Sequence, residues 1–190
     1  MVDIFCRSGV IPIEAALLAA GMSAHKHRRE FAFTKLPGLQ DVDWDERFDA
    51  IDSNHEKKPS NSIIAMDEQF GAVSAAKKNA KIATVNDFID FSRTDLEFLD
   101  AKFGKHGLSM IVTMPPQPHA ALHGPKLIEA LDQTFYQAEF ILKKKGKLCL
   151  ITKSNADTIK ELAAKYKFNI VAERAVWQGG LEMQILVFVK

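Results

Sequence analysis

The sequence is poor in cysteine, and it lacks both long apolar runs and a marked excess of charge of one sign. Its two cysteines, Cys6 and Cys149, cannot build a disulfide framework or a four-cysteine zinc site. No apolar run reaches the ~18 residues that a membrane span needs, and no basic segment precedes an apolar one at the N-terminus, which argues against a secretory signal. A net charge of +1 excludes nucleic-acid binding by bulk charge, although not by a local basic patch. We therefore expect a soluble, cytoplasmic protein with reduced thiols.

The order of apolar and polar residues predicts an α/β domain. The chain has 190 residues, 47% of them hydrophobic, which suits a single domain over residues 1–190. After a short apolar entry over residues 2–5, strands are predicted over residues 62–66, 88–91, 108–113, 147–152, 169–174 and 182–189, and helices over residues 12–20, 70–80, 126–142 and 156–166. This alternation predicts a parallel sheet with helices on both faces. The Gly179-Gly180 pair between the last two strands predicts an antiparallel hairpin.

Two segments depart from this alternation. Residues 24–61 are polar but too rich in aromatic residues for a disordered linker, so we expect a helical insertion packed over the sheet edge. Basic clusters at residues 26–29 and 143–147 could contact phosphates. For the second cluster we favour the C-terminus of the helix over residues 126–142, where lysines suit the helix dipole and Gly146 stops the helix. The first cluster stays open between a phosphate contact and a solvated loop.

The run from Asp3 to Ala16 is the first candidate site. A strand is followed by a tight turn and then a helix, an order that directs backbone N–H groups and the positive helix end toward a ligand. The carboxylate of Asp3, at the end of the strand, could accept from an ammonium group. From spacing alone, the alternative is equally open: Asp3 as a helix cap or surface acid, and Gly9 as a turn residue.

This run resembles the Asp-Pro-Phe-Cys-Gly-Ser-Gly-Thr-Ile-x-Ile-Glu-Ala-Ala signature of the THUMP-associated RNA methyltransferases, which include guanine-N2 methylases of tRNA and rRNA. The resemblance continues through residues 28–37 and 62–67 and through the tail over residues 146–181. Pro115-Pro116 stands where the family carries Asn-Pro-Pro-Tyr or Asp-Pro-Pro-Tyr. The resemblance implies a Rossmann-like class I methyltransferase fold, with a mostly parallel seven-stranded sheet, helices on both faces and a C-terminal antiparallel hairpin.

The resemblance also implies S-adenosyl-L-methionine as cofactor. The methionine end of the cofactor would be bordered by residues of the first loop, namely Asp3, Cys6, Ser8 and Gly9, with Arg7 among them. Asp67, at the end of the second strand, would accept hydrogen bonds from the ribose hydroxyls, although it could instead cap the helix that follows. Ser92 stands near the place where the family carries an acid that contacts the adenine amino group, and Asp90 or Asp95 could substitute for that acid.

Three residues depart from the family pattern at the site itself. Arg7 replaces the first loop glycine, so it needs a negative φ with its side chain in solvent, or else it crowds the cofactor or pairs with the cofactor carboxylate. Met114 replaces the Asn or Asp whose oxygen would align the target amine, and a thioether is a poor acceptor. Gln117 replaces the aromatic residue that would stack on a flipped base, a contact worth ~1–3 kcal/mol. Met114, Pro115, Pro116 and Gln117 thus form a degenerate catalytic motif.

Other residues could supply a base. Asp95, His119 and His123 are candidates, although we favour a helix cap for Asp95 and a polar loop for the two histidines. The resemblance implies RNA, either tRNA or rRNA, as the substrate, and the family usually recruits RNA through a THUMP module, which a partner chain could carry. We therefore weigh an RNA methyltransferase, of low activity because of the degenerate motif, against a catalytically silent binding subunit in an RNA-modification complex. A methylase with another acceptor is a weaker third hypothesis, and the sequence does not indicate the oligomeric state.

Overall fold

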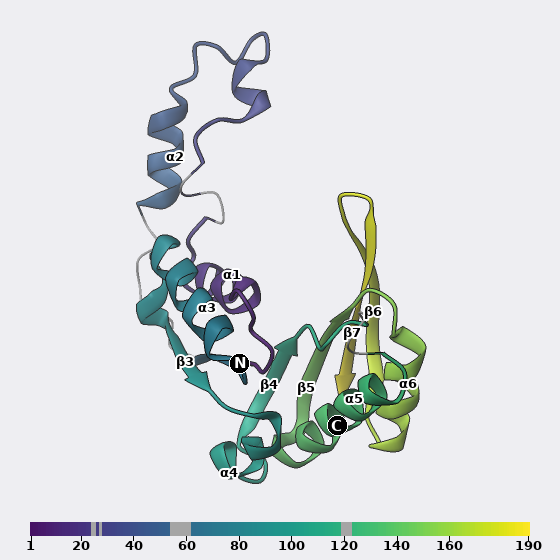
Figure 1. The fold of residues 1–190 in the computed structure, drawn as a ribbon. Coiled ribbons are helices and arrows are strands. Elements are labelled where there is room, and N and C mark those ends of the chain that lie inside the picture. The colour runs from purple at the N-terminus through teal and green to yellow at the C-terminus, as the bar shows by residue number, and fades with distance from the viewer. Residues whose placement is uncertain (24–25, 27, 54–61, 119–122) are drawn as a thin grey trace.

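The structure is a computed structural model that describes residues 1–23, 26, 28–53, 62–118 and 123–190. Its centre is a seven-stranded sheet with the order β3-β2-β1-β4-β5-β7-β6 (Figure 1). The strands are β1 (Val2–Asp3), β2 (Ile63–Asp67), β3 (Ile89–Arg93), β4 (Leu108–Thr113), β5 (Leu142–Thr152), β6 (Asn169–Gln178) and β7 (Leu181–Val189). Neighbours from β3 to β5 pair in parallel, whereas β7 is antiparallel to both β5 and β6. The predicted Rossmann-like sheet with its closing hairpin is confirmed.

Helices cover both faces of this sheet, as predicted (Figure 1). One face carries α1 (Val10–Ala19) and α3 (Phe70–Ile82), and the other carries α4 (Leu99–Phe103), α5 (Pro125–Ile141) and α6 (Ala156–Lys165). Short 3-10 helices are η2 (Asn86–Phe88) and η3 (Leu96–Phe98). Pro12 lies in the first turn of α1, where its missing N–H needs no partner. Among the described residues, no helix combines the length and the apolar character needed to cross a bilayer.

Two hydrophobic clusters pack against the two faces. Because neighbouring residues of a strand point to opposite faces, Ile63 and Ala65 of β2 join the cluster under α1 and α3, whereas Met66 joins the cluster under α5. Phe135 of α5 is fully buried in the larger cluster, where its ring meets that of Phe188 edge-on at a centroid distance of 5.9 Å. The short strand β1 therefore lies between two cores that pack separately.

The basic residues 143–147 do not follow the predicted pattern. Helix α5 ends at Ile141, and β5 begins at Leu142, so Lys143, Lys144 and Lys145 belong to a strand and not to a helix C-terminus. Leu142 is fully buried and pairs with Leu108 of β4. That pairing is non-local, and the burial of Leu142 on the sheet outweighs the local preference for a longer helix. The prediction of lysines at a helix end was therefore wrong.

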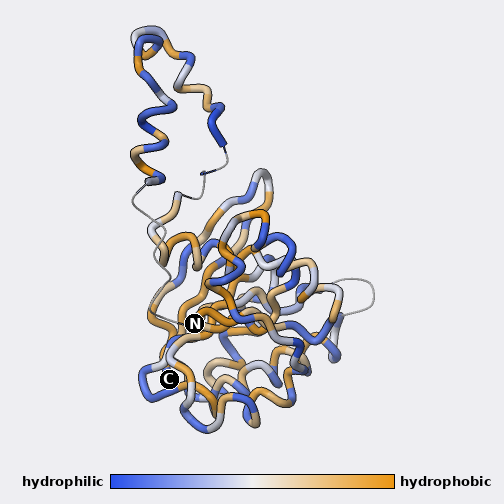
Figure 2. Tube along the Cα trace, turned by 90° about the vertical axis from the view of Figure 1, so that its left-hand side faces the viewer, coloured by the Kyte–Doolittle hydropathy of each residue, from blue (hydrophilic) through white to orange (hydrophobic). Residues whose placement is uncertain are grey.

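The insertion predicted over residues 24–61 carries η1 (Ala32–Lys35) and α2 (Trp44–Asp52), while residues 24–25, 27 and 54–61 lie outside the described part. Residues 28–53, here called the extension, project away from the sheet and do not lie over its edge as predicted (Figures 1 and 2). The extension has its own aromatic cluster, in which the ring of Phe33 lies 5.1 Å from that of Trp44 and Phe31 lies 5.5 Å from Phe48, measured between centroids. Phe33, Trp44 and Phe48 therefore pack against aromatic rings of the extension itself.

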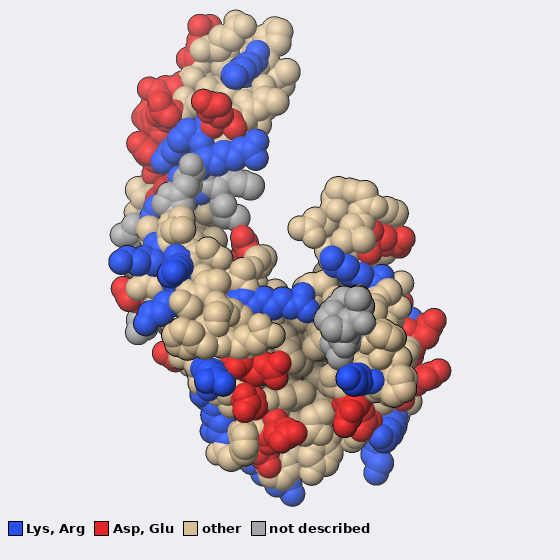
Figure 3. Space-filling view, viewed as in Figure 1, with Lys and Arg blue, Asp and Glu red and all other residues tan. Residues whose placement is uncertain are grey.

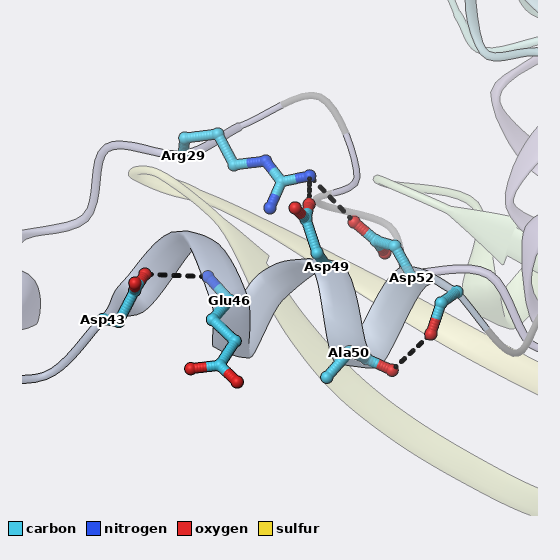
Figure 4. A network of polar contacts seen from close by, with 7 residues as sticks. Arg29, Asp43, Glu46, Asp49, Ala50 and Asp52 are labelled. Carbon is cyan, nitrogen blue, oxygen red and sulfur yellow. Dashed lines mark hydrogen bonds and ion pairs between the residues drawn. The ribbon is translucent and has the colours of Figure 1, made fainter.

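Some of the charged side chains of the extension contact one another or its backbone. Acidic side chains gather along one side of it (Figure 3). The Arg29 guanidinium contacts Asp49 at 2.9 Å and Asp52 at 3.5 Å, and the Asp43 carboxylate accepts from the Glu46 N–H at the start of α2 (Figure 4). Arg28 lies over the Phe31 ring, 4.8 Å from its centroid. For Arg28 and Arg29, these contacts favour a structural role over a phosphate contact.

Candidate functional site

The candidate site lies where the strand order of the sheet reverses. β1 has β2 on one side and β4 on the other, so the loops that leave β1 and β4 turn in opposite directions. Open α/β sheets bind ligands in the crevice outside the carboxyl ends of strands at such a point. Figure 3 shows the surface hollowed between the side that carries α1 and the protruding β6–β7 hairpin. The residues predicted on the first loop, at the end of β2 and after β4 are brought together here.

The loop after β1 is held by two backbone hydrogen bonds and by one side-chain hydrogen bond from α3. The Cys6 N–H donates to the Met66 carbonyl at 2.8 Å, and the Gly9 N–H donates to the Cys6 carbonyl at 2.7 Å. Asn79 of α3 donates to the Ser8 carbonyl at 2.8 Å. Gly9 caps α1 with a φ of 87°, a left-handed conformation that glycine adopts without strain. The loop therefore has a fixed shape that directs the start of α1 toward the crevice.

Asp67 joins the end of β2 to this loop. The residue is 6% exposed; its Oδ2 accepts from the Arg7 N–H and its Oδ1 from the Gln69 N–H, both at 3.0 Å. The N-cap position of α3 is Gln69, so Asp67 forms a turn before the helix and does not cap it directly. The carboxylate thus lies at the rim of the crevice in a position fixed by two backbone donors.

Asp3 is buried directly beneath the crevice. It is 1% exposed, and its Oδ1 accepts from Thr113 Oγ1 at 2.6 Å and from the Phe5 N–H at 3.2 Å. Burial raises the pKa of Asp3 to about 6, and the charge of Asp67 adds to this effect, whereas the two hydrogen bonds and the Arg7 charge oppose it. Asp3 is therefore neither a surface acid nor a helix cap. Thr113, which sequence reasoning missed, is its partner from β4.

Two cavities open from the crevice. The Asp67 cavity, of about 790 Å³, is lined by residues that include Phe5, Arg7, Ser8, Asp67, Gln69, Pro116 and Gln117. The Met114 cavity, of about 420 Å³, is lined by Asp3, Phe5, Cys6, Arg7, Ser8, Val10, Ile11, Met114, Ile151, Lys153, Gln178 and Met183. Phe5, Arg7 and Ser8 line both cavities, so they form the wall between them. No sequence pattern marked Lys153, Gln178 and Met183, which reach the cavity from β7 and from the ends of β5 and β6.

Arg7 and Gln117 both donate to the same carbonyl oxygen. Arg7 has a φ of 47°, so the negative φ considered for it is absent, and its Nη2 donates to the Pro115 carbonyl oxygen at 3.2 Å. Gln117 Nε2 donates to that oxygen at 2.8 Å, while Gln117 Oε1 accepts from the Lys153 N–H at 2.9 Å. A polar bridge therefore links the loop after β1, the loop after β4 and the end of β5.

Several other predicted residues lie apart from the crevice or have unsuitable chemistry. Ser92 Oγ lies 3.0 Å from Thr94 Oγ1, accepts from Lys102 Nζ at 2.6 Å, and lines neither cavity. Asp95 occupies the position before η3, but its side chain makes no capping bond. Cys6, predicted in the first loop, does line the Met114 cavity, and burial raises the pKa of its thiol to about 12, so it does so as a neutral thiol. His123 is exposed, and His119 lies outside the described residues.

Comparison with known proteins decides the family. The model of the UPF0020 family, described as an RMKL-like methyltransferase domain, matches residues 1–184. The chain belongs to this family. The chain is 29% identical over 189 residues to the tRNA (guanine(6)-N2)-methyltransferase of Methanocaldococcus jannaschii, and the match covers 97% of this chain and 47% of that protein. It is 32% identical over 194 residues to the ribosomal RNA large subunit methyltransferase K/L of Pseudoalteromonas atlantica, with 99% of this chain and 26% of that protein covered.

Solved structures show the same fold. The chain superposes on SMU.472, a protein solved in complex with SAH (S-adenosylhomocysteine), with a TM-score of 0.75 and 18% identity. The match covers 98% of this chain and 47% of SMU.472. The chain thus spans about half the length of this structure and of the archaeal relative, and about a quarter of the bacterial one.

Proposed function

We propose that this chain is the catalytic domain of an S-adenosylmethionine-dependent RNA methyltransferase that modifies a base nitrogen of tRNA or rRNA. The observation that carries the proposal is the pair of carboxylates, Asp3 and Asp67, held on either side of one fixed loop at the switch point of the sheet. The names of the relatives indicate RNA as the substrate class. Residues 1–190 would then act as one methyltransferase-fold domain in the cytoplasm, with residues 24–61 as an insertion.

The residues of the crevice suit the cofactor. Asp67 lies at the end of β2, where a carboxylate can accept from both ribose hydroxyls. The buried carboxylate of Asp3 gains a counter-charge if an ammonium group enters the Met114 cavity, which offsets its cost of burial. When bound, the cofactor supplies an electrophilic methyl group on its sulfonium sulfur.

The rest of the first loop shapes the methionine end of this site. Gly9 keeps the backbone of the loop close to α3 and leaves no side chain at the start of α1, while Cys6 and Ser8 line the Met114 cavity. Ser92 would serve the adenine ring only if it exchanged the hydroxyl of Thr94 or the ammonium of Lys102 for the ligand. We retain it as the proposed adenine contact on the ground of the family resemblance alone.

The acceptor would enter the Met114 cavity. The apolar side chains of Val10, Ile151 and Met183 there offer contact to a planar base, and Lys153 supplies a cation for a phosphate. The Met114 thioether replaces the oxygen that would align the target amine, and the Gln117 side chain, where a stacking ring would stand, is held by three hydrogen bonds. Pro115 and Pro116, which join Met114 to Gln117, have fixed φ angles and so restrict the backbone of this loop. Methyl transfer depends mainly on positioning, so we expect a low rate.

One observation favours a second function. Gln117 donates to the Pro115 carbonyl together with Arg7, so its amide is not free to contact a substrate. A catalytically silent subunit of an RNA-modification complex would not need a contact between Gln117 and a substrate. A partner chain with a THUMP module would then recruit the RNA. The two functions differ in whether methyl groups are transferred.

Calorimetry with S-adenosylhomocysteine and a labelled-methyl assay on total tRNA and rRNA test the proposal. We expect binding by the wild type, at least a tenfold loss in Asp67→Ala, and little change in Asp87→Ala, whose exposed carboxylate lies in η2 before β3 and lines neither cavity. Incorporation of label that is lost in Asp67→Ala supports the enzyme, whereas binding without incorporation supports the silent subunit. No heat at millimolar ligand would contradict the cofactor site itself.

A further inference from the structure

The Arg7 side chain lies in the wall between the two cavities. Arg7 lines both the Asp67 cavity and the Met114 cavity, and its backbone N–H donates to the Asp67 carboxylate. A ligand whose ribose meets Asp67 and whose ammonium meets Asp3 has to pass this side chain. The conformation of Arg7 therefore decides whether a single ligand can occupy both cavities.

The present contact of Arg7 is easily exchanged. Residue 7 is exposed, and its guanidinium donates one hydrogen bond of 3.2 Å to an uncharged carbonyl. Its other N–H groups have no hydrogen-bond partner among the described residues. A carboxylate that accepts two parallel bonds from a guanidinium forms charge-assisted bonds, which are about twice as strong as neutral ones. An anionic group that enters here would outcompete the carbonyl.

Gln117 lowers the cost of this exchange. Pro115 is buried, and a buried carbonyl left without a donor costs about 1–3 kcal/mol. Gln117 Nε2 also donates to this oxygen, so the carbonyl keeps a partner when Arg7 leaves. The two departures from the family pattern are therefore complementary, because one residue supplies a mobile cation and the other keeps the vacated acceptor bonded.

We propose that Arg7 is the residue that recognises the carboxylate at the amino-acid end of the cofactor, and that it moves from the Pro115 carbonyl to this carboxylate when the cofactor binds. The inference rests on the proposed function. In the cofactor the carboxylate and the ammonium share one carbon atom, so an ammonium paired with Asp3 brings the carboxylate into the Met114 cavity, which Arg7 lines. Arg7 then binds the carboxylate, and Asp3 the ammonium, of the same zwitterionic amino-acid group.

Calorimetry with two ligands tests this role. S-adenosylhomocysteine carries the amino-acid end, and 5′-methylthioadenosine has the same nucleoside without it. Arg7→Ala is expected to weaken binding of S-adenosylhomocysteine at least tenfold and to change binding of 5′-methylthioadenosine less than twofold. Arg7→Lys, which keeps the charge but not the paired donors, should fall between. Arg93→Ala is the matched control, because the Arg93 guanidinium donates to the Glu68 carbonyl near the site but lines neither cavity.

Each outcome bears on the inference. An equal loss for both ligands in Arg7→Ala, no loss, or tighter binding of S-adenosylhomocysteine would overturn it, and the last result would show that the side chain crowds the cofactor. Circular dichroism establishes that the variant is folded, and if Arg7→Ala does not fold, the Arg7→Lys comparison decides. If the wild type binds neither ligand, the proposed function is contradicted, and the inference with it. If the wild type binds both ligands but Arg7→Ala weakens them equally, only the inference is contradicted.

Discussion

The backbone of Gly9 lies so close to Ala76 that a β-carbon on residue 9 would stand 2.9 Å from the Ala76 β-carbon. Helices α1 and α3 meet at this contact, and Gly9 also needs its φ of 87°. Gly9→Ala should therefore lower the free energy of unfolding by about 2–4 kcal/mol, from overpacking together with the left-handed conformation. Urea unfolding followed by circular dichroism measures the loss.

A second glycine separates the two causes of this loss. Gly179 has a φ of 60°, and no atom lies within 4 Å of the place that a β-carbon would take, so Gly179→Ala should cost only the conformational part, about 1 kcal/mol. Equal losses at Gly9 and Gly179 would show that the contact with Ala76 carries no energetic weight.

Asp3 should make the stability of the protein depend on pH. Burial raises the pKa of Asp3 from 3.8 to about 6, so the folded state holds this proton more tightly than the unfolded chain does. The stabilisation from Asp3 is complete below about pH 4 and is lost as the pH rises through 6. Asp3→Asn carries no charge, so its stability relative to the wild type should rise by on the order of 3 kcal/mol between pH 4 and 8.

Urea unfolding of Asp3→Asn and the wild type at both pH values measures this difference. Asp90→Asn serves as the control, because its carboxylate is exposed and its removal relieves no burial cost. Unfolding curves for Asp3→Asn that shift with pH in parallel with those of the wild type would contradict the assignment.

Met114→Asn should raise the rate of methyl transfer. It introduces an acceptor oxygen next to Pro115, and a preorganised hydrogen-bonding group in an active site is typically worth ~100–1000-fold in rate. The labelled-methyl assay on tRNA and rRNA measures the effect. Met110→Asn is the control, because Met110 precedes Met114 in the same segment of the chain, within β4, but lies outside the Met114 cavity. An equal response of both variants would exclude a specific role for position 114.

The extension should fold without influence on the crevice. Phe48→Ala removes a ring that packs against Phe31, Phe33 and Trp44, so the fluorescence of Trp44 should change while binding of S-adenosylhomocysteine stays within twofold. Phe135→Ala, in the main core, should instead lower global stability by about 3–5 kcal/mol. A marked loss of binding in Phe48→Ala would show that the extension contributes to the site.

The sequence predicted those parts of the fold that depend on local periodicity. The alternation of strands and helices and the hairpin at Gly179-Gly180 are confirmed, because each depends on residues that are close along the chain. The lysines after α5 were misplaced, since the burial of Leu142 depends on Leu108, which lies 34 residues earlier.

The contacts of the site could not be predicted from the sequence either, because they join residues that are far apart along the chain. Arg7 and the Pro115 carbonyl are 108 residues apart, and Asp3 and Thr113 are 110 apart. Sequence reasoning identified Arg7 and Gln117 as departures from a pattern, but only their positions in space show that both bond one oxygen. The orientation of the extension has no local signal either, because its aromatic residues could equally have packed on the sheet.

The division of the core has a consequence for how the protein unfolds. The two hydrophobic clusters meet across β1, which is only two residues long. Each cavity is lined from both halves: the Asp67 cavity by Ala72 of α3 and by Gln117, and the Met114 cavity by Val10 of α1 and by Ile151 of β5. A ligand that spans both cavities would fasten the two halves together. In its absence the α1–α3 half is expected to loosen first, and hydrogen exchange should then become uniform across the sheet when the crevice is filled.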